Sequence, residues 1–144
     1  VVEPKNIEAR TGLMDAAIMG ATAFQKGLGA VHSFAHALST VADLHHGLAN
    51  GIMIPYVLEF NRPAVDARMR DLAAAVGAKD FVVWLKSLRE EIGIPHTLGP
   101  AGVKPEHLDR LVEVAQADFC HSENPRPVSE ADFRGIYTSA LGKN

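Results

Sequence analysis

Four of the seven histidines of this chain lie within fifteen consecutive positions, at His32, His36, His45 and His46. His32 and His36 are about one helical turn apart, so in a helix both imidazoles point to the same side. The residues around them are mostly apolar, which indicates that this face of the helix lies inside. Two imidazoles in an apolar interior leave ring nitrogens unsatisfied unless something binds them, and a divalent metal is one such partner.

His46 follows His32 by 14 residues, an interval that fits a helix, a tight reversal and the first turn of a second helix. Two antiparallel helices would bring His46 back beside His32, and Gly47 allows close approach of the backbone. The spacing predicts a metal clamp of His32 and His46 with His36 beside it. The alternative, core histidines bonded to backbone carbonyls, stays open on spacing alone. The other histidines have no partner at ligand spacing: His45, His96, His107 and His121.

The segments that position these side chains have sequence patterns typical of helices almost throughout. Helices are expected over 7–26, 31–42, 46–60, 64–76, 81–92, from 105 to about 115, and 130–141. Small residues in the first suggest close packing on neighbours, and Pro55 predicts a kink in the third. Asp80 is expected to cap a helix that buries Phe81, Trp84, Leu85, Leu88 and Ile92, and Ser129 and Asp132 resemble a capping box. No convincing run of strands appears, so the fold class is an all-α, multi-helix bundle of six or seven helices.

Composition narrows the class of protein further. The chain has 144 residues, enough for one compact domain, with 47% hydrophobic and 22% charged residues. A net charge of -3 predicts no general attraction to nucleic acid or to anionic membranes. The single cysteine, Cys120, cannot form an internal disulfide, and no apolar run reaches the length of a membrane span, so a cytoplasmic location is expected. The missing initiator Met suggests a fragment, a domain or a processed product.

Three stretches carry a resemblance to a known family. Residues 27–38 read Gly-Leu-Gly-Ala-Val-His-Ser-Phe-Ala-His-Ala-Leu, which resembles the signature of iron-containing alcohol dehydrogenases. Residues 46–61 are similar to the family's second block, which has His-Gly, two residues, Asn, an apolar run, Pro and a closing Asn. The tail 124–127, Asn-Pro-Arg-Pro, is similar to the family's carboxyl end. The chain departs from the pattern at Ser39, where Gly is common, and at His45, where Pro often precedes the ligand histidine.

This resemblance implies that residues 1–144 form the helical, metal-binding carboxyl-terminal domain of the dehydroquinate synthase-like and iron alcohol dehydrogenase fold. His32 and His46 match two metal ligands. His36 matches a histidine near the nicotinamide, which makes it the candidate for proton relay and for cofactor binding. The family's other two ligands, an Asp and a His, are expected before Val1, and the amino-terminal NAD(P)-binding domain is absent from this sequence.

The implied activity is transfer of a hydride between an alcohol and NAD or NADP with Fe²⁺ as the metal, and we expect the chain alone to be inactive. The expected partners are a small alcohol or aldehyde and further copies of the chain, a homo-oligomer, without nucleic acid or membrane. A zinc-dependent member similar to glycerol dehydrogenase is one alternative, and a non-catalytic helical module with structural histidines is another. A haem or di-iron bundle is disfavoured because no Glu-x-x-His pair accompanies these histidines.

Overall fold

The structure, a computed structural model, describes residues 3–142 and contains only helices and turns within that range. The helices are α1 (Ile7–Ala23), α2 (Ala30–Ala42), α3 (His46–Ala75), α4 (Phe81–Glu91), α5 (Leu108–Ala117) and α6 (Glu130–Leu141), with 3-10 turns η1 (Phe24–Lys26), η2 (Gly99–Ala101), η3 (Pro105–His107) and η4 (Phe119–Glu123). The all-α prediction is confirmed. None of the helices in these residues is long and apolar enough to cross a membrane.

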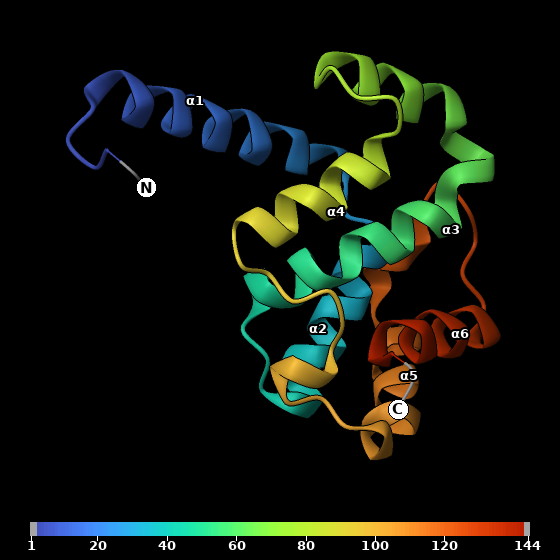
Figure 1. Cartoon of the computed structure of the whole chain (residues 1–144). Helices are drawn as coiled ribbons and strands as arrows, with labels where there is room; N and C mark the ends of the chain where they lie inside the picture. The colour runs from blue at the N-terminus through green and yellow to red at the C-terminus, as the bar shows by residue number, and fades with distance from the viewer. Residues whose placement is uncertain (1–2, 143–144) are drawn as a thin grey trace.

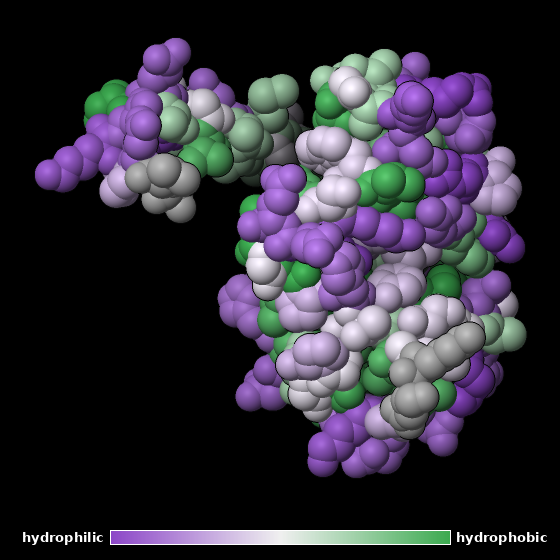
Figure 2. Space-filling model, viewed as in Figure 1, coloured by the Kyte–Doolittle hydropathy of each residue, from purple (hydrophilic) through white to green (hydrophobic). Residues whose placement is uncertain are grey.

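Helix α1 projects away from the bundle formed by the other helices (Figure 1). It begins at Asn6, whose side chain accepts a hydrogen bond from the Ala9 N–H, and it buries no residue. Its small residues suggested close packing on neighbours, but within the described residues nothing covers them. Large apolar side chains therefore stay exposed along it and in the following turn, as the green atoms on the projecting arm of Figure 2 show. These side chains are Ile7, Leu13, Met14, Ile18, Met19 and Phe24.

The core lies where α2 packs against α3, α5 and α6. Phe34 of α2 is fully buried, with its ring centroid 4.9 Å from that of Phe133 and 4.7 Å from that of Tyr137, both on α6. The Tyr137 hydroxyl donates a hydrogen bond of 2.9 Å to the Phe34 carbonyl, which pairs the polar end of a fully buried ring. This aromatic cluster fixes the position of α2 relative to the carboxyl-terminal helix.

Helix α3 is continuous through Pro55, where a kink was expected. Pro55 cannot donate to the Gly51 carbonyl, but the buried Arg89 guanidinium approaches that carbonyl at 3.5 Å and donates to the Ile52 carbonyl at 2.8 Å. The non-helical residue is instead Val65, with φ -132° and ψ 21°. The break follows Pro63, where the ring removes a second backbone donor. The kink at Pro55 stays a prediction, since the helix continues through this residue and Arg89 from α4 offers a donor to the carbonyl that Pro55 leaves unpaired.

Helix α4 confirms its predicted cap but not its predicted buried face. The Asp80 carboxylate accepts hydrogen bonds from the Val82 and Val83 N–H groups. The fully buried residues are Val82 and Arg89, seven residues apart and so on one side of the helix, whereas Ile92 is 61% exposed. The contact of Arg89 with the α3 carbonyls sets the rotation of α4. The expected apolar face is consequently only half-buried along most of its length.

The capping box of α6 is formed as predicted. Ser129 Oγ accepts a hydrogen bond from the Asp132 N–H, and the Asp132 carboxylate accepts one from the Ser129 N–H. Pro105 opens the turn η3, which leads directly into α5, and α5 buries Leu111, Val112 and Ala115 as expected. These features begin the two helices that pack against α2 and complete the core.

We expect Tyr137→Phe to lower the free energy of unfolding by about 1 kcal/mol, because it keeps the ring and removes one buried hydrogen bond. Burial raises the pKa of Tyr137 above its ordinary value, so the hydroxyl is a neutral donor at every pH of the test. Urea denaturation monitored by circular dichroism measures the change. The matched control is Tyr56→Phe, which removes a bond of 2.8 Å to the His96 carbonyl at an exposed position. Equal losses in the two variants would contradict the role given to the buried bond.

Candidate metal centre

A short reversal between α2 and α3 returns the chain to the level of His32. Asp43 ends α2 in the left-handed conformation, with φ 52°. The Leu44 N–H donates to the Leu38 carbonyl, and Ser39 Oγ donates to the Leu44 carbonyl at 2.9 Å. Ser39 stands where the family signature commonly has Gly, and here its hydroxyl pairs a carbonyl of the turn. The helix that begins at His46 therefore runs back alongside α2, as the spacing predicted.

The structure brings His32, His36 and His46 together. Their ring centroids lie 5.8 Å (His32 to His36), 5.5 Å (His32 to His46) and 5.2 Å (His36 to His46) apart. The first two come from successive turns of α2, and the third from the first turn of α3. His45 is exposed and lies outside this cluster, as do the other histidines, His96, His107 and His121. The predicted proximity of the three side chains is confirmed, and their role as metal ligands stays a prediction.

The surroundings of His32 favour a neutral ring. Burial lowers the pKa of His32, and repulsion by His46 and then His36 lowers it further, against an opposing effect of Asp118. A neutral imidazole keeps the lone pair that a metal ligand needs. The close approach of the rings thus disfavours protonation and leaves a nitrogen of His32 available to a cation.

Asn50 provides a structural test of whether a cation fits. Its side-chain amide donates to His46 Nε2 at 2.9 Å and to the His46 carbonyl at 3.0 Å, while its own Oδ1 is buried without a hydrogen-bond partner. The amide hydrogen thus supplies the positive partner that a metal ion bound to this nitrogen would supply. An unpaired buried oxygen is unfavourable, so this arrangement can exchange for one with an ion. The donor set of two imidazoles, His32 and His46, with a nearby amide oxygen suits a divalent transition metal.

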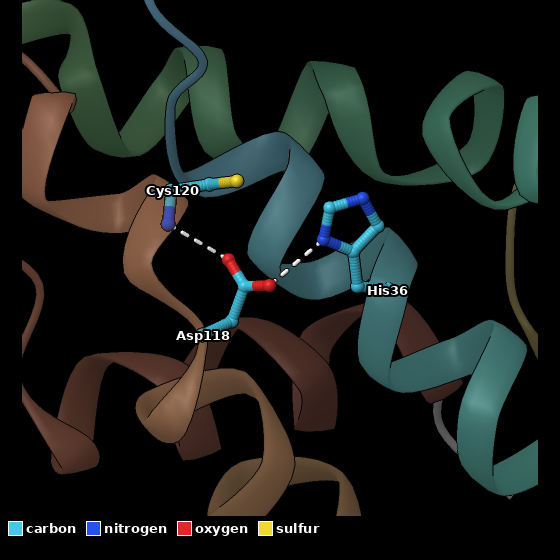
Figure 3. Close-up of side chains that lie close together, drawn as sticks. All are labelled: His36, Asp118 and Cys120. Carbon is cyan, nitrogen blue, oxygen red and sulfur yellow. Dashed lines mark hydrogen bonds and ion pairs between the residues drawn. The ribbon is translucent and has the colours of Figure 1, made fainter.

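His36 has a further partner that the sequence analysis missed. Asp118 Oδ2 lies 2.8 Å from His36 Nδ1, and Asp118 Oδ1 accepts hydrogen bonds from Ser33 Oγ at 2.7 Å and from the Cys120 N–H at 2.8 Å (Figure 3). Burial alone raises the pKa of the Asp118 carboxyl, but the bonds from His36, Ser33 and Cys120 outweigh it and lower the pKa to about 2. Asp118 is therefore ionised, and both of its carboxylate oxygens have hydrogen-bond partners. Its position 82 residues after His36 gave no signal, because only the fold brings them together.

Asn124 connects the start of α2 to α3. Its Oδ1 accepts from the Ala30 N–H at 3.3 Å and from Asn61 Nδ2 at 3.0 Å, and its Nδ2 donates to Asn61 Oδ1 at 2.7 Å. A Cβ on Gly29 would lie 3.3 Å from Asn124 Oδ1, so this glycine allows the close approach. The two asparagines come from the segments, 46–61 and 124–127, that carried the family resemblance. They hold the helix that bears His32 in register with the helix that bears His46.

A groove of about 470 Å³ runs beside His32 and Asn50. The rest of its lining is mostly apolar and comes from the end of α1, the loop before α2, and α2 and α3. These residues include Phe24, Leu28, Val31 and Ile54. The histidine cluster thus lies next to a space that favours a small molecule with an apolar portion.

Comparison with known proteins gives one consistent result. Residues 1–141 match the model of the Fe-containing alcohol dehydrogenase family, C-terminal. The chain is 35% identical over 146 residues to 4-hydroxybutyrate dehydrogenase of Cupriavidus necator, covering 93% of this chain and 38% of that protein. It is 33% identical to the NAD-dependent methanol dehydrogenase of Bacillus methanolicus, covering 98% of this chain and 40% of the relative. The chain therefore spans about two fifths of the length of these curated relatives.

A solved structure agrees with the sequence comparison. The alcohol dehydrogenase from Oenococcus oeni superimposes with a TM-score of 0.88 at 32% identity, covering 94% of this chain and 38% of that one. The match includes nearly all of the helical architecture described above.

We expect Asn124→Ala to lower the free energy of unfolding by about 1–3 kcal/mol, because it leaves the buried Asn61 side chain and the Ala30 N–H without partners. Chemical denaturation measures the change. Ser122→Ala is the control in the same segment, since the exposed Ser122 hydroxyl bonds only to the nearby Phe119 carbonyl. Its expected effect is within about 0.5 kcal/mol. If both variants unfolded at the same denaturant concentration, the connection between α2 and α3 would not depend on Asn124.

Proposed function

The chain belongs to the iron-containing alcohol dehydrogenase family, and from this premise we propose that it supplies the metal-binding helical part of an NAD(P)-linked alcohol dehydrogenase. The single observation that carries the proposal is the convergence of His32, His36 and His46, with ring centroids within 5.8 Å of one another. The Asn50 amide beside them has an unpaired buried oxygen. We propose His32 and His46 as ligands of Fe²⁺, with Zn²⁺ as the alternative metal.

When bound, such a metal polarises the oxygen of an alcohol or carbonyl substrate. The chain's own residues do the remaining positioning. Helices α2 and α3 hold His32 and His46 facing each other, and the lowered pKa of His32 keeps its lone pair free at neutral pH. The apolar groove beside His32 receives the carbon skeleton of a small alcohol or aldehyde.

His36 is proposed as the residue that moves the proton released when an alcohol is oxidised. Its side chain is 38% exposed, so one edge of the ring reaches solvent while the ring itself packs on His46. An imidazole is the side chain best suited to proton transfer near neutral pH. By the same resemblance, His36 lies near the nicotinamide of the bound cofactor.

The competing assignments fit less well. Among the described residues, none of the three clustered rings donates to a backbone carbonyl, which is what structural core histidines are expected to do. A zinc enzyme similar to glycerol dehydrogenase remains a candidate of the same class. The exposed apolar side chains of α1 favour association with further protein surface, so we retain a homo-oligomer as part of the proposal.

Metal binding by the purified chain tests the ligand assignment. We expect Zn²⁺ to bind more tightly than Fe²⁺, in the usual affinity order, and His32→Ala and His46→Ala each to weaken binding at least about tenfold, a loss of about 1.4 kcal/mol. Isothermal titration calorimetry measures both. His45→Ala is the matched control, because His45 adjoins His46 in sequence and is exposed outside the cluster. A loss of affinity in the control equal to that in the other two variants would refute the assignment.

The chain by itself is expected to show no turnover of alcohols with NAD⁺ or NADP⁺, even when loaded with metal. Residues 3–142 contain no strand, so this part of the chain holds no strand–turn–helix unit of the kind that binds a dinucleotide pyrophosphate. Absorbance of the reduced nicotinamide with methanol, 4-hydroxybutyrate and related alcohols measures the activity. Metal-dependent turnover by the pure chain, abolished by His32→Ala, would show that this prediction is wrong and that these residues suffice.

A further inference from the structure

His36 is held by an acceptor that is itself fixed from two sides. The Asp118 side chain is 15% exposed, and the residue caps η4 directly after the end of α5. The hydroxyl of the buried Ser33, one turn before His36, and the backbone N–H of Cys120 both donate to Asp118 Oδ1. Only Oδ2 remains to face the imidazole, at 2.8 Å from Nδ1. The direction of the ring is therefore set by bonds from two elements of the fold.

This geometry decides which nitrogen of His36 carries the hydrogen. An ionised carboxylate only accepts, so the nitrogen beside Asp118 Oδ2 must be the donor. In a neutral imidazole one nitrogen donates and the other accepts, which leaves Nε2 with the lone pair. Figure 3 shows that this second nitrogen lies on the side of the ring away from the carboxylate. The basic nitrogen is thus turned away from Asp118.

A metal site made of His36, Asp118 and Cys120 explains the same cluster less well. Their ligand atoms lie within 4.8 Å of one another. However, both oxygens of Asp118 are already engaged by donors. Burial, followed by the bond to Asp118, raises the pKa of the Cys120 thiol to about 11, so the thiolate that would bind a metal is disfavoured. The cluster is a hydrogen-bond network.

We propose that Asp118 is the positioning residue for His36, and that it fixes the tautomer in which Nε2 is a proton acceptor directed away from the Asp118–Ser33 network. The proposal rests on the proposed function. As the alcohol is oxidised, the O–H bond breaks and its proton passes to Nε2. The C–H bond of the same carbon breaks, hydride leaves with its electron pair to the oxidised nicotinamide, and the C=O bond forms. Nε2 then returns the proton to water.

The isosteric substitution Asp118→Asn tests the proposal, because it keeps the shape of the side chain and replaces one acceptor oxygen by an NH₂ donor. The Cys120 N–H cannot become an acceptor, so the amide oxygen must take the Oδ1 position, and the amide NH₂ must face His36 Nδ1. We expect His36 to change from the Nδ1–H to the Nε2–H tautomer. Two-bond ¹H–¹⁵N correlation spectra of the ¹⁵N-histidine-labelled chain report this, at a pH where imidazoles are neutral. Ser33→Ala is the matched control, since it keeps the carboxylate and should keep Nδ1–H.

The outcomes separate this inference from the proposed function. A wild-type chain with His36 in the Nε2–H tautomer, or an Asp118→Asn chain that keeps Nδ1–H, would overturn the inference without any assay of activity. Asp118→Ala gives a second reading should the Asn variant fold poorly, since it removes the acceptor and should likewise lose the Nδ1–H tautomer. The proposed function would fail separately, through absence of metal binding in the calorimetric titrations.

Kinetics supply the second readout. In the metal-loaded dehydrogenase that contains this chain, Asp118→Asn should lower kcat for alcohol oxidation by about 10²–10⁴-fold, with little change in KM. A reversed tautomer with unchanged kcat would show that the position of the proton on His36 does not matter to the reaction. An inactive wild-type holoenzyme would count against the proposed function and leave the tautomer result standing.

Discussion

The structure depends on helix α2, which buries one face in the core and carries the histidines on another. Phe34 and Leu38 face the core and are fully buried, while His32 and His36 point out of it on another side of the same helix. The two faces stay in place only if the buried face is packed firmly, because a loosely packed helix can rotate and move the imidazoles. The aromatic packing of Phe34 and the hydrogen bond from the Tyr137 hydroxyl to the α2 backbone hold this face in place. The positions of two histidines therefore follow from contacts made on the opposite side of their helix.

Helices α2 and α3 contain backbone N–H and carbonyl groups without helical partners, and side chains from distant segments pair with them. Pro55 frees a carbonyl inside α3, and Arg89 of α4 approaches it. The first N–H groups of α2 lack helical partners, and Asn124 satisfies the one on Ala30 while bonding Asn61 on α3. Arg126 then donates to the Phe60 carbonyl and stacks on the Phe60 ring. Each of these contacts joins α3 to another element, so the register between α2 and α3 is defined by bonds as well as by packing.

Local chemistry explains which features could be predicted from the sequence. Helix starts at Asp80 and Ser129, the reversal after Asp43 and the return of His46 all follow from short-range spacing. The failures are long-range. The pairing of the α3 carbonyls near Pro55 depends on Arg89, and the rotation of α4 follows from the same contact. Asp118 is adjacent to His36 only because η4 packs against α2. No periodicity in the chain encodes a pair of residues so far apart.

The three clustered histidines lie close together but have different second partners, and the roles proposed for them rest on this difference. His32 contacts the other two imidazoles, the Phe24 ring and a groove, and burial lowers its pKa, which favours the neutral ring. His46 has the Asn50 amide on Nε2, a partner that a cation can replace. His36 alone has a carboxylate partner, 2.8 Å from Nδ1, and this partner fixes the direction of the ring. A metal ligand and a proton acceptor need different partners. The fold supplies both within 5.8 Å, because Asp118 reaches one ring and not the others.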